Sequence, residues 1–331
     1  MKFLIAGLGS IGRRHLRNLK ALGQNDLVLY RTHKATLPDA ELAEFPTFTE
    51  LDLALEQKPD GVIISNPTAL HLSIALPAAK AGAALLIEKP VSDSLIGIRE
   101  LQNVLEETNK PALVGFHFRY HPVLQEIKQL IDSGRLGNAL KAHVHWGEYL
   151  PGWHPWEDYR HSYAARTDLG GGALNTLSHP IDYIRWMMGE VGSVSADLTN
   201  LSSLELDVED NAELTFRLQS GSLATIHLDY YQRPPSHTLS IAFENGIVNW
   251  DNNTGIARAI DVVRQTEEVI QPPEGFERND MFLAEMDAFV RLCKGEELSH
   301  CTLADGKRVQ KIVEVCVQSS GQRSCLVHLP S

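Results

Sequence analysis

The residues with the clearest chemical meaning form a glycine-rich turn near the start of this 331-residue sequence. Gly7-Leu8-Gly9-Ser10-Ile11-Gly12 has the spacing GxGxxG and directly follows an apolar run over residues 3–6. In this spacing the first glycine permits a tight turn, the second lets backbone approach a pyrophosphate, and the third lets a helix pack on the strand. The start of that helix offers N–H groups to phosphate oxygens. We therefore predict a dinucleotide site at Gly7, Gly9, Ser10, Ile11 and Gly12.

A basic run at the end of the second predicted strand bears on the choice of cofactor. Arg31-Thr32-His33-Lys34 stands where a carboxylate about 20 residues after the glycines would bind the ribose 2′-hydroxyl of NAD. Guanidinium, hydroxyl and ammonium groups suit a 2′-phosphate instead, and Arg13 and Arg14 add positive charge. We predict that Arg31 and Thr32 select NADP(H), with NAD(H) also possible. A solvated basic turn is the alternative.

The elements that must position these groups alternate between strand and helix up to about residue 115. Short apolar strands are predicted over residues 3–6, 27–30, 61–65, 84–87 and 112–115, and helices over 11–22, 70–81 and 96–107. Apolar strands separated by crossover helices are typical of a parallel sheet covered on both faces. We predict that residues 1–118 form a Rossmann-fold domain that binds NAD(P).

The pattern changes after a predicted helix over residues 123–133. Longer runs that alternate apolar and polar residues cover 140–149, 211–219, 222–231 and 237–250, and two late helices cover 281–294 and 303–319. Asn245-Gly246 is a strong hairpin signal between such runs. The fold class is therefore predicted as α/β: the parallel sheet of 1–118, then an α+β domain over 119–331 with a large open, mostly antiparallel sheet. Packing of the two late helices against the first domain is an alternative within this prediction.

Composition excludes several classes of protein. The chain has 30 Lys and Arg against 42 Asp and Glu, a net charge of −12, with 43% hydrophobic residues. This apolar content argues against disorder, and the acidic balance argues against nucleic-acid binding. No apolar run approaches the roughly 20 residues of a membrane helix, and no secretory leader is read at the start. The four cysteines form no CxxC pair, so we predict reduced thiols, no metal and a cytoplasmic location.

Further motifs carry a family resemblance. Glu88-Lys89-Pro90 follows the strand over 84–87, Asn66-Pro67-Thr68 follows the strand over 61–65, and a later predicted helix carries His179. With the early GxGxxG, this set resembles the glucose-fructose oxidoreductase/inositol dehydrogenase/MocA family over essentially the whole chain. The resemblance implies a nicotinamide-dependent oxidoreductase acting on sugars, cyclitols or their derivatives. It also implies a homodimer or homotetramer formed through the C-terminal sheet.

The same resemblance assigns roles in the first domain. Lys89 is implied as a catalytic residue between cofactor and substrate, where an ammonium group polarises a carbonyl and stabilises an alkoxide. Pro90 is expected to follow a cis peptide bond. Further cofactor contacts are implied for Asn66, Pro67, Thr68, His71, Glu88 and Lys89.

Residues 170–182 resemble the catalytic helix of the family, in which His179 is implied as general acid and base. The aspartate that often precedes this histidine by one turn is missing, and Asn175 and Thr176 stand there. His179 would then lack the negative charge that raises its pKa, although Asp182, three residues later, can partly substitute. A packed, structural histidine is the alternative.

The substrate is expected to meet an aromatic, Pro/Gly-interrupted segment over residues 145–166. Aromatic rings stack on sugar faces and arginines clamp carboxylates or phosphates. A subunit interface or a satellite core is the alternative for this segment. Arg119 and His121, in a segment resembling the family's crossover, are weighed against a structural linker. The predicted substrate-binding residues are Arg119, Tyr149, Trp153, Tyr159, Arg160, Tyr163, Arg166, Asn175, Thr176 and Asp182.

Together these features predict an NADP(H)-dependent oxidoreductase that transfers hydride to or from a hydroxyl or keto carbon of a sugar. The aromatic segment and the run after the glycines resemble family members linked to surface-sugar and sialic-acid-like biosynthesis, which favours an anionic or nucleotide-linked sugar. Two alternatives stay open. One is an enzyme that holds NAD(P) tightly and causes no net redox change, and the other is a binding protein without catalysis. No nucleic-acid or membrane partner is predicted.

Overall fold

The computed structural model describes residues 1–32, 37–297 and 301–329. The chain forms two compact units. Unit 1 comprises Met1–His117 and Glu277–Gln310, and unit 2 comprises Phe118–Phe276 and Lys311–Ser331. None of the helices in the described residues is long and apolar enough to cross a membrane.

A six-stranded parallel sheet forms the centre of unit 1, with the order β3-β2-β1-β4-β5-β6. The strands are β1 (Lys2–Ala6), β2 (Asp26–Tyr30), β3 (Thr47–Phe48), β4 (Gly61–Ile64), β5 (Ala84–Glu88) and β6 (Ala112–Gly115). All residues of β4 and β5 are buried, as expected for strands covered on both faces. The strand order reverses between β1 and β4, and ligands of such sheets bind at that point, beyond the carboxyl ends of the strands.

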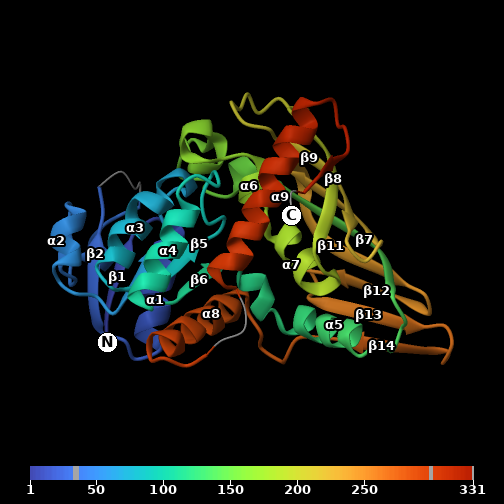
Figure 1. The fold of residues 1–331 in the computed structure, drawn as a ribbon, viewed down its shortest axis with the longest axis horizontal. Helices are drawn as coiled ribbons and strands as arrows, with labels where there is room; N and C mark the ends of the chain where they lie inside the picture. The colour runs from blue at the N-terminus through green and yellow to red at the C-terminus, as the bar shows by residue number, and fades with distance from the viewer. Residues whose placement is uncertain (33–36, 298–300, 330–331) are drawn as a thin grey trace. The chain divides into compact units, whose positions relative to one another are not determined.

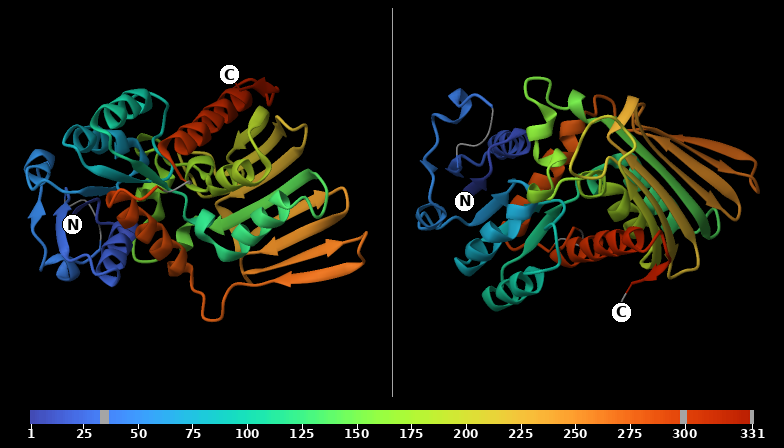
Figure 2. Two further views of the ribbon diagram at one scale, coloured as in Figure 1. Left: turned by 60° about the horizontal axis from the view of Figure 1, so that its bottom comes forward. Right: turned by 90° about the horizontal axis from the view of Figure 1, so that it is seen from above.

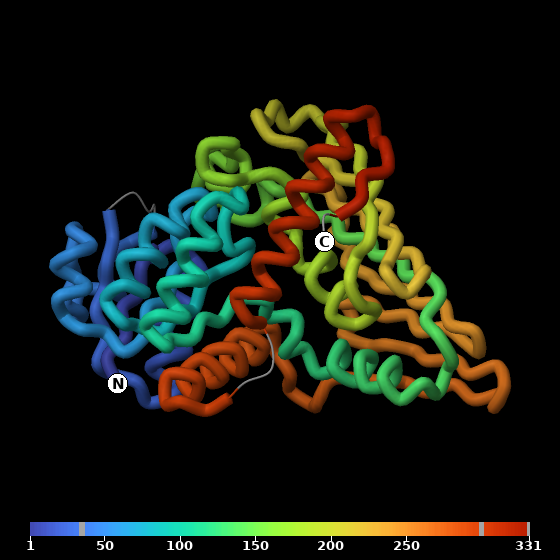
Figure 3. Tube along the Cα trace, in the orientation of Figure 1, coloured from blue at the N-terminus to red at the C-terminus, as the bar shows by residue number. Residues whose placement is uncertain are grey.

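The helices of unit 1 include one that arrives late in the sequence. They are α1 (Ser10–Ala21), α2 (Leu51–Leu55), α3 (His71–Lys80), α4 (Ile98–Thr108) and α8 (Arg278–Cys293). Figure 1 shows α3 and α4 side by side against the sheet. In the trace of Figure 3, the orange α8 lies beside the blue α1. Asn279 Nδ2 donates to Asn18 Oδ1 at 3.0 Å, and Arg14 lies over the Phe282 ring.

Unit 2 contains a nine-stranded sheet with the order β14-β13-β12-β11-β7-β10-β9-β8-β15. Its strands are β7 (Ala139–Tyr149), β8 (Val191–Thr199), β9 (Asn211–Leu218), β10 (Leu223–Asp229), β11 (Tyr231–Phe243), β12 (Gly246–Asp251), β13 (Ile256–Asp261), β14 (Thr266–Ile270) and β15 (Val327–His328). Every neighbouring pair is antiparallel except β7 with β10, which is parallel. The predicted fold class, a parallel sheet plus a mostly antiparallel one, is confirmed. The predicted hairpin at Asn245-Gly246 joins β11 to β12.

Burial alternates along the strands of unit 2. In β9, Ala212, Leu214 and Phe216 are buried while Glu213 and Thr215 are exposed, so one face of the sheet is apolar and the other polar. The helices of this unit are α5 (Pro122–Asp132), α6 (Ala173–Thr176), α7 (His179–Met188) and the latter part of α9 (Leu303–Gly321). In the right view of Figure 2, these helices lie on one side of the nine-stranded sheet, and no helix of the described part of unit 2 lies on its other side. Short 3-10 turns occur at Ala40–Leu42, Thr68–Leu70, His117–Tyr120, Leu150–Gly152, Tyr159–His161, Tyr163–Ala165 and Thr167–Leu169.

Two sequence expectations about unit 2 are corrected by the structure. The single helix expected around His179 is two helices, because α6 ends at Thr176 and α7 begins at His179. Pro180 explains the break, since in a continuous helix it could not donate to the carbonyl of Thr176 and its ring would clash with that carbonyl, whereas proline is favoured in the first turn of a helix. The strands β8, β13 and β14 are absent from the predicted set. Strand β8 carries glycine, serine and aspartate, which have low strand propensity.

Candidate cofactor and substrate sites

The glycine-rich turn has the geometry that a dinucleotide site requires. Gly7 has φ +89°, and a Cβ there would lie 2.6 Å from Asn66 N, so the turn is closed to other residues. At Gly12 a Cβ would lie 1.9 Å from Gly7 O, where α1 packs on the turn. At Gly9 an added Cβ would meet nothing within 4 Å. The turn is therefore tight at its first and third glycines and open at the second, where a pyrophosphate approaches in such motifs.

The segment after β4 places polar atoms beside this turn. Asn66 Oδ1 is buried and has no hydrogen-bond partner among the described residues. An acceptor left unpaired in this way is costly unless another group, such as a ribose hydroxyl, satisfies it. Thr68 is buried, and Pro67 is half-buried between these two residues.

His71 links the two motif segments of unit 1. Its Nδ1 lies 2.9 Å from Pro90 O and its Nε2 lies 2.9 Å from Asn66 O. Burial lowers the pKa of His71, and a neutral imidazole donates only one N–H at a time. His71 thus lies between the backbone carbonyls of Asn66 and Pro90 and donates a hydrogen bond to one of them, which makes it a positioning residue for these segments.

The Glu-Lys-Pro motif ends β5 in the expected conformation, because the Lys89–Pro90 bond is cis. The Glu88 side chain turns inward and accepts a hydrogen bond from His15 Nε2 at 2.8 Å. Glu88 Oε2 also accepts the backbone N–H of Lys89 at 3.2 Å. Burial raises the pKa of Glu88, but the hydrogen bond and charge of His15 and the charge of Lys89 together bring it below its usual value. Lys89 itself is half-buried.

Sequence reasoning missed a second buried carboxyl group at this position. Glu285, on α8, is fully buried, and neither of its oxygens has a hydrogen-bond partner among the described residues. Its oxygens lie within 4.8 Å of ligand atoms of His15 and Glu88. Burial and the charge of Glu88 raise the pKa of Glu285 well above its usual value, so it is neutral while Glu88 is ionised. A glutamate on the buried face of a predicted helix, between Phe282 and Phe289, is the signal that reveals such a group.

Arg31, the first residue of the basic run after β2, pairs with a carboxylate that the sequence reading did not identify near it. Arg31 is buried, and its Nη1 donates to Asp39 Oδ1 at 2.6 Å. Arg13 donates to Leu37 O and Pro38 O, which holds this segment against the turn. Arg31 and Asp39 are eight residues apart, and the sequence pattern alone does not show that they form a pair. Thr32 is exposed, and His33 and Lys34 lie outside the described residues.

In unit 2, Arg119 and Asp182 form a buried bidentate pair. Arg119 Nε donates to Asp182 Oδ2 at 2.8 Å and Nη2 donates to Oδ1 at 2.7 Å. Both side chains are at most 3% exposed. Fork-to-fork pairs of this kind are strong and geometrically specific. Each group is thus oriented by the other, and contact of either with a substrate stays a prediction.

His179 is the first residue of α7 and is buried within an aromatic cluster. Its ring centroid lies 5.0 Å from that of Phe118 and 6.0 Å from that of Trp146. Asn175 and Thr176 lie on the preceding short helix, where Asn175 Nδ2 donates to Gly171 O at 3.3 Å. The surroundings fit a packed histidine as well as a catalytic one, so the assignment of His179 stays a prediction.

The aromatic segment of unit 2 is held by local contacts. Tyr159 Oη donates to Leu204 O at 3.0 Å, and Trp153 packs edge-on against Tyr230. The arginines expected to clamp an anion each pair with an aspartate two residues away, Arg160 with Asp158 and Arg166 with Asp168. Arg233 lies over the Tyr149 ring, and Tyr163 is exposed. Substrate contacts in this segment stay predictions.

Two family models match the chain. Residues 1–116 match the model described as the oxidoreductase family with an NAD-binding Rossmann fold. Residues 124–249 match the GFO/IDH/MocA C-terminal domain.

Individual relatives agree with these matches. YrbE, an uncharacterised oxidoreductase of Bacillus subtilis, is 29% identical over 67% of this chain and 65% of its own length, so the match spans less than two thirds of that relative. Myo-inositol 2-dehydrogenase of Thermotoga maritima is 27% identical over 93% of this chain and 92% of its own length. Among solved structures, levoglucosan dehydrogenase in complex with NADH matches with a TM-score of 0.88 and 20% identity over 100% of this chain and 99% of that one, which establishes similarity of fold.

Proposed function

Because this chain belongs to the GFO/IDH/MocA family, we propose that it is a nicotinamide-dependent oxidoreductase that acts on CH–OH groups and transfers hydride to or from a sugar or sugar derivative. One observation carries the proposal: the turn is open at Gly9, and Asn66, which lies against Gly7 of the same turn, has a buried Oδ1 without a hydrogen-bond partner among the described residues. The names of relatives support a polyol or sugar substrate, since they include myo-inositol 2-dehydrogenase and levoglucosan dehydrogenase.

A nicotinamide dinucleotide fits the residues at this turn. We infer that Gly7, Gly9, Ser10, Ile11 and Gly12 hold its pyrophosphate and that Asn66, Pro67 and Thr68 lie along its ribose. When bound, the nicotinamide donates or accepts the hydride. Glu88 contributes indirectly, because it holds the backbone N–H of Lys89.

The preference for NADP(H) over NAD(H) is a finer proposal that rests on Arg31. A guanidinium group suits a 2′-phosphate, and this one is already oriented by Asp39. Asp39 opposes the preference, because its negative charge repels a phosphate and can accept a ribose hydroxyl instead. We propose that the balance between Arg31 and Asp39 sets how strongly NADP(H) is favoured.

Proton chemistry is assigned to one residue of each unit. We propose that the Lys89 ammonium group stabilises negative charge developing on the substrate oxygen and that His179 exchanges its proton. Arg119, Asp182 and the aromatic segment are the proposed substrate ligands, and an anionic or nucleotide-linked sugar is the proposed class. A homo-oligomer formed through the sheet of unit 2, in the cytoplasm, completes the proposal.

The test is a screen of polyols, sugar acids and nucleotide sugars with NAD(P)+, and of the matching keto compounds with NAD(P)H, followed at 340 nm. We expect turnover with at least one member of these classes. Net conversion of a substrate with no lasting absorbance change would favour the alternative in which the cofactor is reoxidised within one turnover. Binding of sugars without any conversion would overturn the enzymatic proposal.

A further inference from the structure

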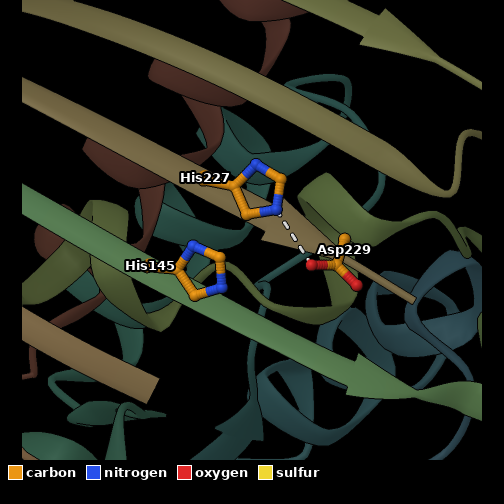
Figure 4. Close-up of side chains that lie close together, drawn as sticks. All are labelled: His145, His227 and Asp229. Atoms are coloured by element: carbon orange, nitrogen blue, oxygen red, sulfur yellow. Dashed lines mark hydrogen bonds and ion pairs between the residues drawn. The ribbon is translucent and has the colours of Figure 1, made fainter. Parts of the chain in front are cut away.

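The polar face of the sheet in unit 2 carries a group of histidines on its central strands. His143 and His145 stand two residues apart on β7, and His227 on the parallel neighbour β10 is paired with His145 in register. Asp229, two residues after His227 on the same strand, lies beside it. Figure 4 shows His145, His227 and Asp229 facing one another, and we call these three residues the histidine site.

The ligand atoms of the histidine site lie at distances suited to one metal ion. One nitrogen of each imidazole and one oxygen of the Asp229 carboxylate all lie within 4.8 Å of one another. His227 Nε2 and Asp229 Oδ2 are 2.9 Å apart. Tetrahedral zinc with bonds of about 2.0–2.1 Å separates its ligand atoms by about 3.3 Å. The two rings are stacked at 4.6 Å, so a modest rotation of the half-buried His145 ring completes the set.

Surrounding groups orient two of the three ligands. Glu213 Oε1 accepts a hydrogen bond from His227 Nδ1, which places the free lone pair of the ring on Nε2, toward Asp229. Asp229 Oδ1 accepts the backbone N–H groups of Tyr231 and Gln232 at 2.9 and 2.7 Å, which leaves Oδ2 available. A carboxylate on the far nitrogen of a ligand histidine is the usual outer partner in metal sites.

A glycine makes room for the oxygen ligands. Gly147 is the next residue of β7 on the same face as His145, and a Cβ there would lie 2.2 Å from Asp229 Oδ2 and 2.3 Å from Gln232 Oε1. Gln232 Oε1 also contacts His145 Nε2. The site therefore has two imidazoles, a carboxylate and an amide oxygen converging over a position without a side chain.

We propose that the histidine site binds one divalent transition-metal ion per chain, of the class represented by Zn²⁺. Two imidazoles and one carboxylate match the ligands that such ions prefer, and Ca²⁺ or Mg²⁺ would require more oxygen ligands. Asp229 is almost fully buried while the His227 side chain is 15% exposed, so the ion reaches the site from the polar face. This site is independent of the proposed redox chemistry.

The competing arrangement is an imidazolium without a metal. His227 lies between Asp229 and Glu213, and the hydrogen bonds that it donates to these carboxylates, with the one to Asp229 the larger effect, raise its pKa. That arrangement requires neither the His145 ring at 4.6 Å nor the missing side chain at Gly147. A metal ion accounts for the stacking, for both carboxylates and for the glycine.

The experiment measures Zn²⁺ uptake by the full chain after EDTA treatment, using equilibrium dialysis with metal analysis and titration calorimetry. We expect one Zn²⁺ per chain. His227→Ala and His145→Gln should remove this uptake at a Zn²⁺ concentration that saturates the wild-type protein. Glu213→Gln should weaken binding by about tenfold or more, because it removes only the outer partner. Loading with Co²⁺ should give the intense visible absorption of a four-coordinate ion.

His143→Ala is the matched control, since His143 lies on the same strand and face but contacts Thr225 Oγ1 instead. It should bind Zn²⁺ as the wild-type protein does. Thermal unfolding of every variant without metal checks that the sheet is intact, and His145→Gln spares the backbone contacts of Asp229. The proposal is overturned if the wild-type protein takes up no Zn²⁺, or if His143→Ala loses as much uptake as His227→Ala.

Discussion

Unit 1 and unit 2 neutralise their charged side chains in different ways. In unit 1, buried charges near the strand ends have partners from distant segments: Glu88 meets His15 of α1 and lies near Glu285 of α8. In the aromatic segment of unit 2, Arg160 and Arg166 pair with aspartates two residues away and stay in contact with water. By contrast, the Arg119–Asp182 pair of unit 2 is buried and long-range. We therefore expect that removing a buried charged side chain lowers the free energy of unfolding more than removing an exposed one.

Removing one member of the buried pair should have the largest effect. Arg119→Ala leaves the Asp182 carboxylate buried without its bidentate partner, which should cost about 3–5 kcal/mol in the free energy of unfolding. Urea unfolding measures this value. Arg160→Ala, on an exposed pair, should leave the same measurement unchanged. Equal losses of unfolding free energy in the two variants would contradict the distinction between buried and exposed pairs. Recovery of stability in Arg119→Met/Asp182→Leu would show that the loss comes from the buried carboxylate left without its partner.

Lys89→Ala should lower kcat by about a hundredfold or more while NADP(H) affinity stays nearly unchanged. The reason is that the ammonium group is proposed to act on charge that develops during reaction, and such catalytic groups contribute about 10²–10⁴-fold. Steady-state kinetics and cofactor titration by fluorescence separate the two effects. Turnover equal to that of the wild-type protein would remove Lys89 from the mechanism.

Glu285→Gln should change how stability depends on pH. The pKa of Glu285 is raised in the folded protein by burial and by Glu88, so its contribution is complete below the ordinary value of 4.5 and is lost as pH rises above it. The variant should therefore gain stability, relative to the wild-type protein, more at pH 8 than at pH 4. Urea midpoints across this range test the sign. The exposed Glu107→Gln on α4 is the control, and a similar profile in both variants would contradict the buried, neutral state of Glu285.

Asp39→Asn should have the smallest effect, a shift of about two- to fivefold in relative affinity toward NADP(H). Asp39 is 57% exposed, and ion pairs with an exposed partner are worth about 0.2–1 kcal/mol. Arg31→Ala should shift the ratio of dissociation constants in the opposite direction. If NAD(H) binds the wild-type protein more tightly and neither variant moves the ratio, Arg31 does not select the cofactor.

The sequence allowed the elements of unit 1 to be predicted because each buried strand is a short apolar run bounded by turns, and because the GxGxxG motif is local. Fold class followed from such local patterns, and the cis bond before Pro90 was implied by the family resemblance that the motifs carry. Fold class, family and the cis bond are confirmed. The ion-pair partners of the charged side chains could not be predicted from the sequence. Asp39 lies eight residues after Arg31, and Arg119 and Asp182 are 63 residues apart in the chain, so neither pair has a periodic signature.

The break between α6 and α7 shows a second limit. Residues 170–182 were read as one helix, although Pro180 stands near the end of this range. A proline in this position predicts that a helix starts there rather than continues, because proline cannot donate to the carbonyl four residues earlier. The roles of His179 and of the aromatic segment stay predictions, because packing and catalysis both place aromatic and imidazole rings in contact.

The return of residues 277–310 to unit 1 has a consequence for synthesis of the protein. The backbone N–H of Val114 donates to Cys301 O, and Glu285 lies near the Glu88–His15 pair, so the first half of the chain is incomplete by itself. Most of unit 2 must leave the ribosome before these residues do. The apolar surface of unit 1 that α8 covers in the folded protein therefore stays exposed while unit 2 is being synthesised.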